Sequence, residues 1–144
     1  MTLQFDKLTP NLIVNDISET VLFYTQKLGF NLKMLVPADT QKMIDVFEKG
    51  KKYKCAMICR GEAFFMFMEK SSYKSEMKNL NSSNVSMSGI LYCDISEGIE
   101  EFRNDLSAKG VKIVRDIETK WYGMKEFYIE DCNGYIIGFG EKVK

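Results

Sequence analysis

Apolar residues recur at helical spacing in two parts of the chain, each time with the tetrapeptide Asp-Ile-Ser-Glu at the start. The first set is Ile17, Val21, Tyr24 and Leu28, and the second is Ile95, Ile99, Phe102 and Leu106, each 78 residues after its counterpart. Steps of 4, 3 and 4 place each set on one face of an amphipathic helix. Asp16 and Asp94 are the expected N-caps of these helices, with a glutamate three residues later. Gly29 and Gly110 are the expected ends.

Strand-like segments surround both helices in the same order. They are expected at residues 11–14, 30–36, 52–60 and 62–69, and again at 89–92, 111–117, 123–130 and 135–141. The pattern predicts one domain over residues 1–144, built from a β-α-β-β-β module at 5–70, a linker at 71–86 and a second module at 87–141. A helical turn is expected near residues 73–80, and a long loop at 37–51.

Composition excludes several classes of protein. The chain of 144 residues has 20 basic and 20 acidic residues, which argues against a nucleic-acid partner. It has no histidine, so imidazole metal sites and histidine bases are excluded. The start does not resemble a signal peptide, and no apolar run approaches the roughly 18 residues of a membrane helix. With four cysteines expected as thiols, a cytoplasmic protein without a membrane partner is predicted.

Segments near both ends of the chain carry family motifs. Thr9-Pro-Asn-Leu12 leads into Asn15-Asp16 and residues 23–30, and residues 121–135 lead into Gly140-Glu141. These segments resemble the opening and the closing strand and turn of the vicinal oxygen chelate superfamily, which includes glyoxalase I, extradiol dioxygenases and the fosfomycin and bleomycin resistance proteins. Cys132 stands where the family's closing turn usually has proline. The resemblance implies an α+β fold in which two tandem βαβββ modules form a curved mixed β-sheet cup with helices on the outer face.

The resemblance also implies a divalent metal held by the first and last strand of each module. The matching positions are Thr9, Phe65, Met87 and Gly138. These residues cannot supply the nitrogen and oxygen ligands that such a site needs. No metal or other cofactor is therefore expected, and enzymatic activity is disfavoured. Two alternatives stay open: a lyase, isomerase or dioxygenase-like enzyme with an unrecognised or absent metal, and an accessory interaction domain.

Strand alternation from these positions predicts the lining of the cup. The residues expected to face a ligand are Thr9, Asn11, Ala63, Phe65, Phe67, Met87, Gly89, Trp121, Ile136, Gly138 and Gly140. Those expected beneath the helices are Leu12, Val14, Phe64, Met66, Met68, Ile90, Tyr92, Ile137 and Phe139. Core packing of Phe65, Phe67 and Trp121 and bends at the glycines are the competing interpretations. Glu126, Glu130 and Tyr128 are given no role in the site, because a lone carboxylate such as Glu126 in an alternating strand normally points to water.

The resulting hypothesis is a metal-free protein of the bleomycin-resistance type. It would sequester an apolar or aromatic small molecule in the cup, as antibiotic resistance proteins do, and would form a homodimer with pockets near the interface.

Overall fold

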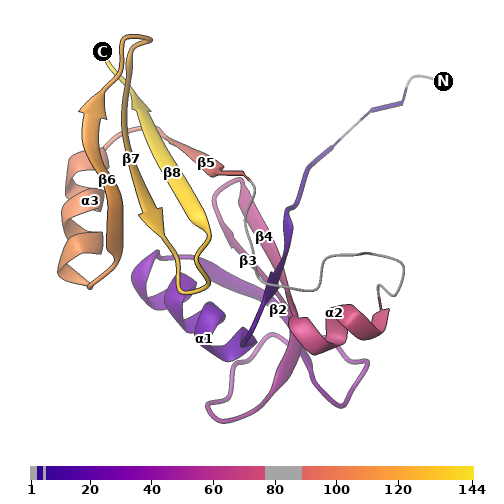
Figure 1. Ribbon diagram of the computed structural model, residues 1–144. Coiled ribbons are helices and arrows are strands. Elements are labelled where there is room, and N and C mark those ends of the chain that lie inside the picture. The colour runs from indigo at the N-terminus through magenta and orange to yellow at the C-terminus, as the bar shows by residue number, and fades with distance from the viewer. Residues whose placement is uncertain (1–2, 5, 77–88) are drawn as a thin grey trace.

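The computed structural model describes residues 3–4, 6–76 and 89–144, and its strands form two four-stranded sheets (Figure 1). Sheet one has the order β1-β4-β3-β2 and comprises β1 (Asn11–Val14), β2 (Asn31–Pro37), β3 (Tyr53–Arg60) and β4 (Ala63–Glu69). Sheet two has the order β5-β8-β7-β6 and comprises β5 (Leu91–Ile95), β6 (Lys112–Thr119), β7 (Met124–Glu130) and β8 (Ile136–Lys142). In each sheet the outer pair β1–β4 or β5–β8 is parallel and the other pairs are antiparallel. The α+β fold with two βαβββ modules is confirmed.

The helices of the two modules start differently. Helix α1 (Ile17–Leu22) continues as the π-helical turn η1 (Phe23–Lys27), and the Asp16 carboxylate accepts from the Glu19 N–H at 3.0 Å, so this predicted cap is confirmed. The predicted cap at Asp94 is wrong. Asp94 lies inside β5, paired with β8, and α3 (Ile99–Ala108) begins only after Gly98, whose φ of 87° is left-handed. The repeated tetrapeptide therefore ends a strand in one module and caps a helix in the other.

The segments between the repeated elements are short or irregular. Helix α2 (Lys70–Glu76) follows β4 directly, and the rest of the helical turn predicted near 73–80 lies outside the described residues. The long loop after β2 is fixed to the sheet by Ile44, which exchanges backbone hydrogen bonds of 2.7 and 2.8 Å with Leu35. No helix within the described ranges is long and apolar enough to cross a membrane.

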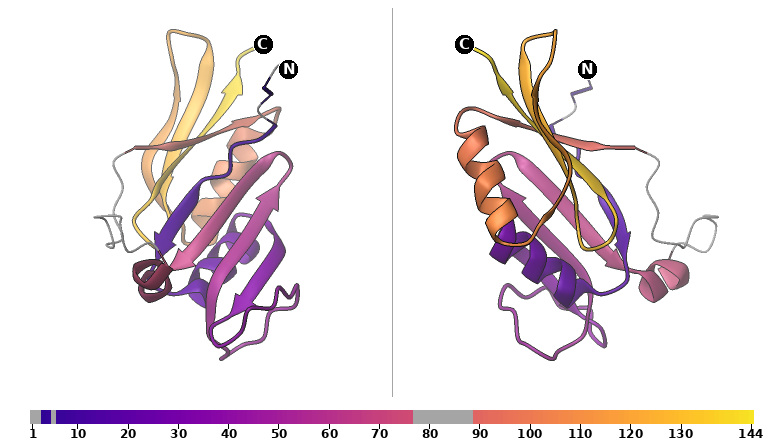
Figure 2. Two further views of the ribbon diagram at one scale, coloured as in Figure 1. Left: turned by 90° about the vertical axis from the view of Figure 1, so that its right-hand side faces the viewer. Right: turned by 60° about the vertical axis from the view of Figure 1, so that its left-hand side comes forward.

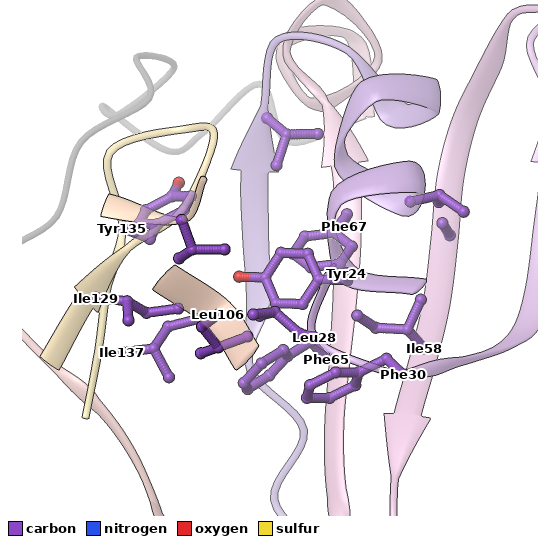
Figure 3. Packing of buried hydrophobic residues seen from close by; sticks show 14 of the residues in the cluster. Tyr24, Leu28, Phe30, Ile58, Phe65, Phe67, Leu106, Ile129, Tyr135 and Ile137 are labelled. Carbon is purple, nitrogen blue, oxygen red and sulfur yellow. The ribbon is translucent and has the colours of Figure 1, made fainter. Parts of the chain in front are cut away.

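The faces of the two sheets that α1 and α3 cover share one apolar core. Figure 3 shows Tyr24 and Leu28 between Phe65 and Phe67 of sheet one and Ile137 of sheet two. These side chains are buried, and the burial of Tyr24 and Leu28 agrees with the helical periodicity of the first module. Burial of both faces in a single core joins the two modules.

Polar contacts reinforce the junction between the modules. The Tyr24 hydroxyl donates to the Asp131 carboxylate at 2.7 Å, and the Tyr135 hydroxyl donates to the backbone carbonyl of Ile13. Burial raises the pKa of Asp131, although hydrogen bonds from Tyr24 and from the backbone of Tyr135 and Asn133 oppose this shift. Both contacts connect the first module with the loop between β7 and β8.

The opposite face of each sheet is covered by neither α1 nor α3, and we call it the helix-free face. In the left view of Figure 2 the strands β2, β3 and β4 stand in front of α1, so the helix-free face of sheet one is toward the viewer. On sheet one this face carries Met34, Val36, Cys55, Met57, Cys59, Phe64, Met66 and Met68. On sheet two it carries Tyr92, Met124, Glu126, Tyr128, Ile136, Gly138 and Gly140.

Replacing Tyr24 by phenylalanine tests the junction. The variant Tyr24→Phe should lower the free energy of unfolding by about 1–3 kcal/mol, because a buried carboxylate oxygen of Asp131 loses its donor. Tyr135→Phe is the matched control, since it removes a hydroxyl that donates to a neutral carbonyl, and its loss should be smaller. Urea denaturation of the two variants at pH 7 measures both values, and an equal or reversed order would contradict this account.

Candidate functional site

Phe65 and Phe67 lie on the helix-covered side of β4. They are 4% and 0% exposed, and their ring centroids lie 5.7 and 5.1 Å from that of Tyr24. The prediction that these two rings face a ligand is wrong, and Ala63 also packs against the core. The prediction that Phe64, Met66 and Met68 pack beneath the helices is wrong for the same reason.

The error in β4 arises because equivalent positions of β4 and β8 lie on opposite faces of their sheets. Two residues, Gly61 and Glu62, connect β3 to β4, whereas five residues connect β7 to β8. Counting four residues past the turn glycine reaches the third residue of each strand, which is Phe65 on the helix-covered face of sheet one but Gly138 on the helix-free face of sheet two. A shift by one residue exchanges every side chain of a strand between the two faces.

Tyr92 lies on the helix-free face of sheet two, not beneath α3 as predicted. Its neighbours Leu91 and Cys93 pack against the core instead. Strands β1 and β5 end 81 residues apart, at Val14 and Ile95, whereas the apolar positions of the helices repeat after 78. The odd difference of three residues reverses the face that is inferred from the repeat.

Gly138 and Gly140 lie on the helix-free face of sheet two beneath two tyrosine rings. A Cβ at Gly138 would lie 2.6 Å from Cε1 of Tyr128 and 3.0 Å from Cδ2 of Tyr92. A Cβ at Gly140 would overlap the Tyr92 hydroxyl. The space that these glycines leave is thus occupied by aromatic side chains of the same chain, and Ile136 extends the same face.

Three tyrosine hydroxyls converge on one carboxylate above these glycines. We call Tyr92, Tyr122, Glu126 and Tyr128 the tyrosine–glutamate cluster. Tyr92 and Tyr122 donate to Oε1 of Glu126 at 2.9 and 2.8 Å, and Tyr128 donates to Oε2 at 3.0 Å. Glu126 is only 3% exposed, so its expected position in water is wrong. Tyr92 comes from β5 and Tyr122 from the turn before β7, whereas Glu126 and Tyr128 belong to β7 itself.

The cluster keeps a negative charge at neutral pH. Burial raises the pKa of Glu126, but the hydroxyls of Tyr122, Tyr92 and Tyr128 and the charge of Lys120 outweigh burial, and the net pKa is lowered. Its hydrogen bond to Glu126 raises the pKa of Tyr122 to about 12, and burial together with Glu126 raises those of Tyr92 and Tyr128. The phenols therefore stay protonated while the carboxylate stays ionised.

The remaining predicted site residues are spread over the molecule. Asn11 is exposed and pairs in register with Met66 on the helix-free face of sheet one, and Thr9 precedes it by two residues. Gly89 is exposed just before β5, and Met87 lies outside the described residues. Trp121 is 94% exposed, and its ring meets that of Tyr122 edge-on with centroids 5.4 Å apart.

A cleft of about 480 Å³ lies between the two modules, on the helix-covered side. The Arg60 guanidinium borders it, donates to the Leu28 carbonyl at 2.6 Å and stacks 5.2 Å from the centroid of Phe102. Among those predicted site residues that the structure describes, only Ala63 lines this cleft. The cleft is therefore separate from both helix-free faces.

The residues at the expected metal positions do not fit a divalent metal. Phe65 is in the core, Gly138 has no side chain, and Thr9 offers a single hydroxyl. Within the described parts of the chain, no group of three or more cysteine, aspartate or glutamate side chains is arranged to hold an ion. We therefore derive no reaction step through a metal.

A family model matches almost the whole chain. The model of the Glyoxalase/Bleomycin resistance protein/Dioxygenase superfamily aligns with residues 4–139. The chain belongs to this superfamily. A search of curated protein sequences finds no significant match.

Solved structures show the same fold at low sequence identity. TioX from Micromonospora sp. ML1 is 17% identical with a TM-score of 0.69, and the match covers 96% of this chain and 100% of TioX. A superfamily enzyme from Burkholderia phytofirmans PsJN is 14% identical with a TM-score of 0.70, covering 94% and 97%. A virulence protein from Salmonella typhimurium is 21% identical with a TM-score of 0.64, covering 99% and 100%. Likeness at these identities supports the shared fold alone.

Adding a methyl group at Gly140 tests the packing of the cluster. Gly140→Ala should lower the free energy of unfolding by about 1–3 kcal/mol, because the new Cβ displaces the Tyr92 ring. Gly89→Ala is the matched control, since apart from Gly89 and its two chain neighbours no atom of the described residues lies within 4 Å of the added Cβ, and it should change stability by less than about 0.5 kcal/mol. Thermal and urea unfolding measure both variants, and equal effects would contradict the packing described.

Proposed function

We propose that this superfamily member is a metal-free binding protein that sequesters an apolar or aromatic small molecule on its helix-free faces. The observation that carries the proposal is a row of methionines across sheet one. Met34, Met57 and Met66 are register partners on three neighbouring strands, and all three are half-buried. Phe64 lies in the next row, with the Lys7 ammonium 3.7 Å from its ring centroid.

A row of methionines can adapt to apolar ligands of different shapes. The thioether side chain is flexible and polarizable, and it packs well against aromatic rings. An apolar ligand bound there removes its own surface and that of the methionines from water, which favours binding. The tyrosine–glutamate cluster on sheet two would supply the polar contacts that orient such a ligand.

We propose that the protein acts as a homodimer. The helix-covered faces are already used to join the modules, so the helix-free faces are the sheet surfaces left for a second copy. A second copy would close these faces, with the exposed side chains Ile90 and Trp121 beside sheet two covered in the process. In the cell, such a protein would protect against a toxic ligand in the cytoplasm, in keeping with the resistance proteins of its superfamily.

A charge placed in the methionine row tests the binding surface. Met57→Glu should weaken binding of the neutral probe N-phenyl-1-naphthylamine by roughly tenfold or more, because a carboxylate on this face must be desolvated against the ligand. Met43→Glu is the matched control, since this methionine is 79% exposed in the loop after β2. Fluorescence titration of folded variants measures both affinities, and unchanged affinity of Met57→Glu would refute the proposed surface.

Sedimentation equilibrium tests the proposed assembly. The chain has a mass of 16.6 kDa, and the particle in solution should have twice that mass at micromolar concentration. Bound probe should reach a fixed stoichiometry per dimer. A monomer that binds the probe with full affinity would show that one chain alone forms the site.

A further inference from the structure

Two half-exposed aromatic rings meet at a single oxygen of a buried carboxylate. The hydroxyls of Tyr92 and Tyr122 both donate to Oε1 of Glu126. The two tyrosines are 42% and 49% exposed, whereas Glu126 is almost completely covered. The two rings therefore keep part of their surface exposed beside one fixed negative charge on the helix-free face of sheet two.

This arrangement attracts positive charge. The faces of aromatic rings carry negative potential, and an ionised carboxylate at their base adds to it. The protein's own cations already lie beside the cluster. The Arg115 guanidinium lies 5.6 Å from the Tyr128 ring centroid, and the Lys120 ammonium, which helps to lower the pKa of Glu126, forms an ion pair with Glu118 at 2.8 Å.

We propose that Tyr92, Tyr122 and Glu126 bind the methylated ammonium group of a small organic cation. This inference rests on the proposed function and names the ligand class that the same binding surface would take. The exposed Trp121, whose ring meets that of Tyr122 edge-on, would supply a further aromatic surface to the ammonium group. Aromatic rings with a nearby carboxylate are the chemistry by which proteins recognise such groups.

The hydrogen bonds within the cluster favour a methylated ammonium over other cations. An ionised carboxylate has about four acceptor positions, and three hydroxyls already use the carboxylate of Glu126. A primary ammonium or a metal ion would need these acceptors and would have to displace the hydroxyls. A methylated ammonium needs no hydrogen bond, because the ring faces and the negative charge of Glu126 attract it without one.

Two probes of the same shape isolate the contribution of charge. The cation (3-hydroxyphenyl)trimethylammonium and the neutral 3-tert-butylphenol share ring, hydroxyl and branched group. Isothermal titration calorimetry of the intact protein at low salt should show the cation binding roughly 5- to 30-fold more tightly. The preference should decrease as the salt concentration rises, because the interaction is partly exposed.

Three variants test whether the preference for the cation comes from the tyrosine–glutamate cluster. Glu126→Gln keeps an acceptor for the hydroxyls but removes the charge, so it should bring the two affinities to within about twofold while the neutral probe binds as before. Tyr122→Leu removes one ring and should weaken the cation alone by roughly fivefold, which provides a second test if Glu126→Gln does not fold. Glu97→Gln makes the same change of net charge at an exposed position before α3 and should leave both affinities unchanged.

The outcomes separate this inference from the function on which it rests. Tighter binding of the cation that Glu126→Gln abolishes would support the ammonium site. Equal binding of the two probes would overturn the ammonium site and leave the proposed apolar binding function standing. Binding of neither probe at millimolar concentration would overturn both.

Discussion

The burial of both helix-covered faces in one apolar core determines which surfaces of this protein are left for binding. Tyr24 connects the two sheets through that core and donates to Asp131 at its edge. Because the helices and the core occupy one side of each sheet, function must use the opposite sides or the cleft beside Arg60. The two helix-free faces are the chemically more distinctive surfaces, since one presents methionines and the other a hydrogen-bonded carboxylate.

The sequence pattern predicts where the helices and strands lie. It does not predict on which face of the sheet each strand residue lies. Helical positions such as Leu28 and Leu106 follow from a local period of 3.6 residues, and both are buried as predicted. The face on which a strand residue lies alternates along the strand, so a shift of one residue in register or an odd difference in repeat length reverses the assignment. This is why strand alternation predicts the wrong faces for Phe65 and Tyr92, while Ile137 lies in the core as it predicts.

The tyrosine–glutamate cluster could not be predicted from any one segment, because its members come from β5, β7 and the turn between β6 and β7. One signal was present in the sequence. Gly138 and Gly140 alternate along one strand, and the neighbouring β7 carries Tyr128 and Glu126 at the paired positions. Small residues opposite large ones indicate that rings lie across the strand, so glycines in a sheet can mark space filled by the chain itself as well as space for a ligand.

The burial of Glu126 distinguishes the two helix-free faces energetically. An ionised carboxylate removed from water costs several kcal/mol unless hydrogen bonds replace its hydration. Three tyrosine hydroxyls make that replacement, and they hold the charge at a fixed point beneath rings that remain in solvent. In the proposed dimer, a ligand between copies would meet an adaptable apolar surface on one side and a fixed charge on the other. Affinity would then depend mainly on the methionines and orientation on Glu126, because burial is non-directional whereas charge is localised.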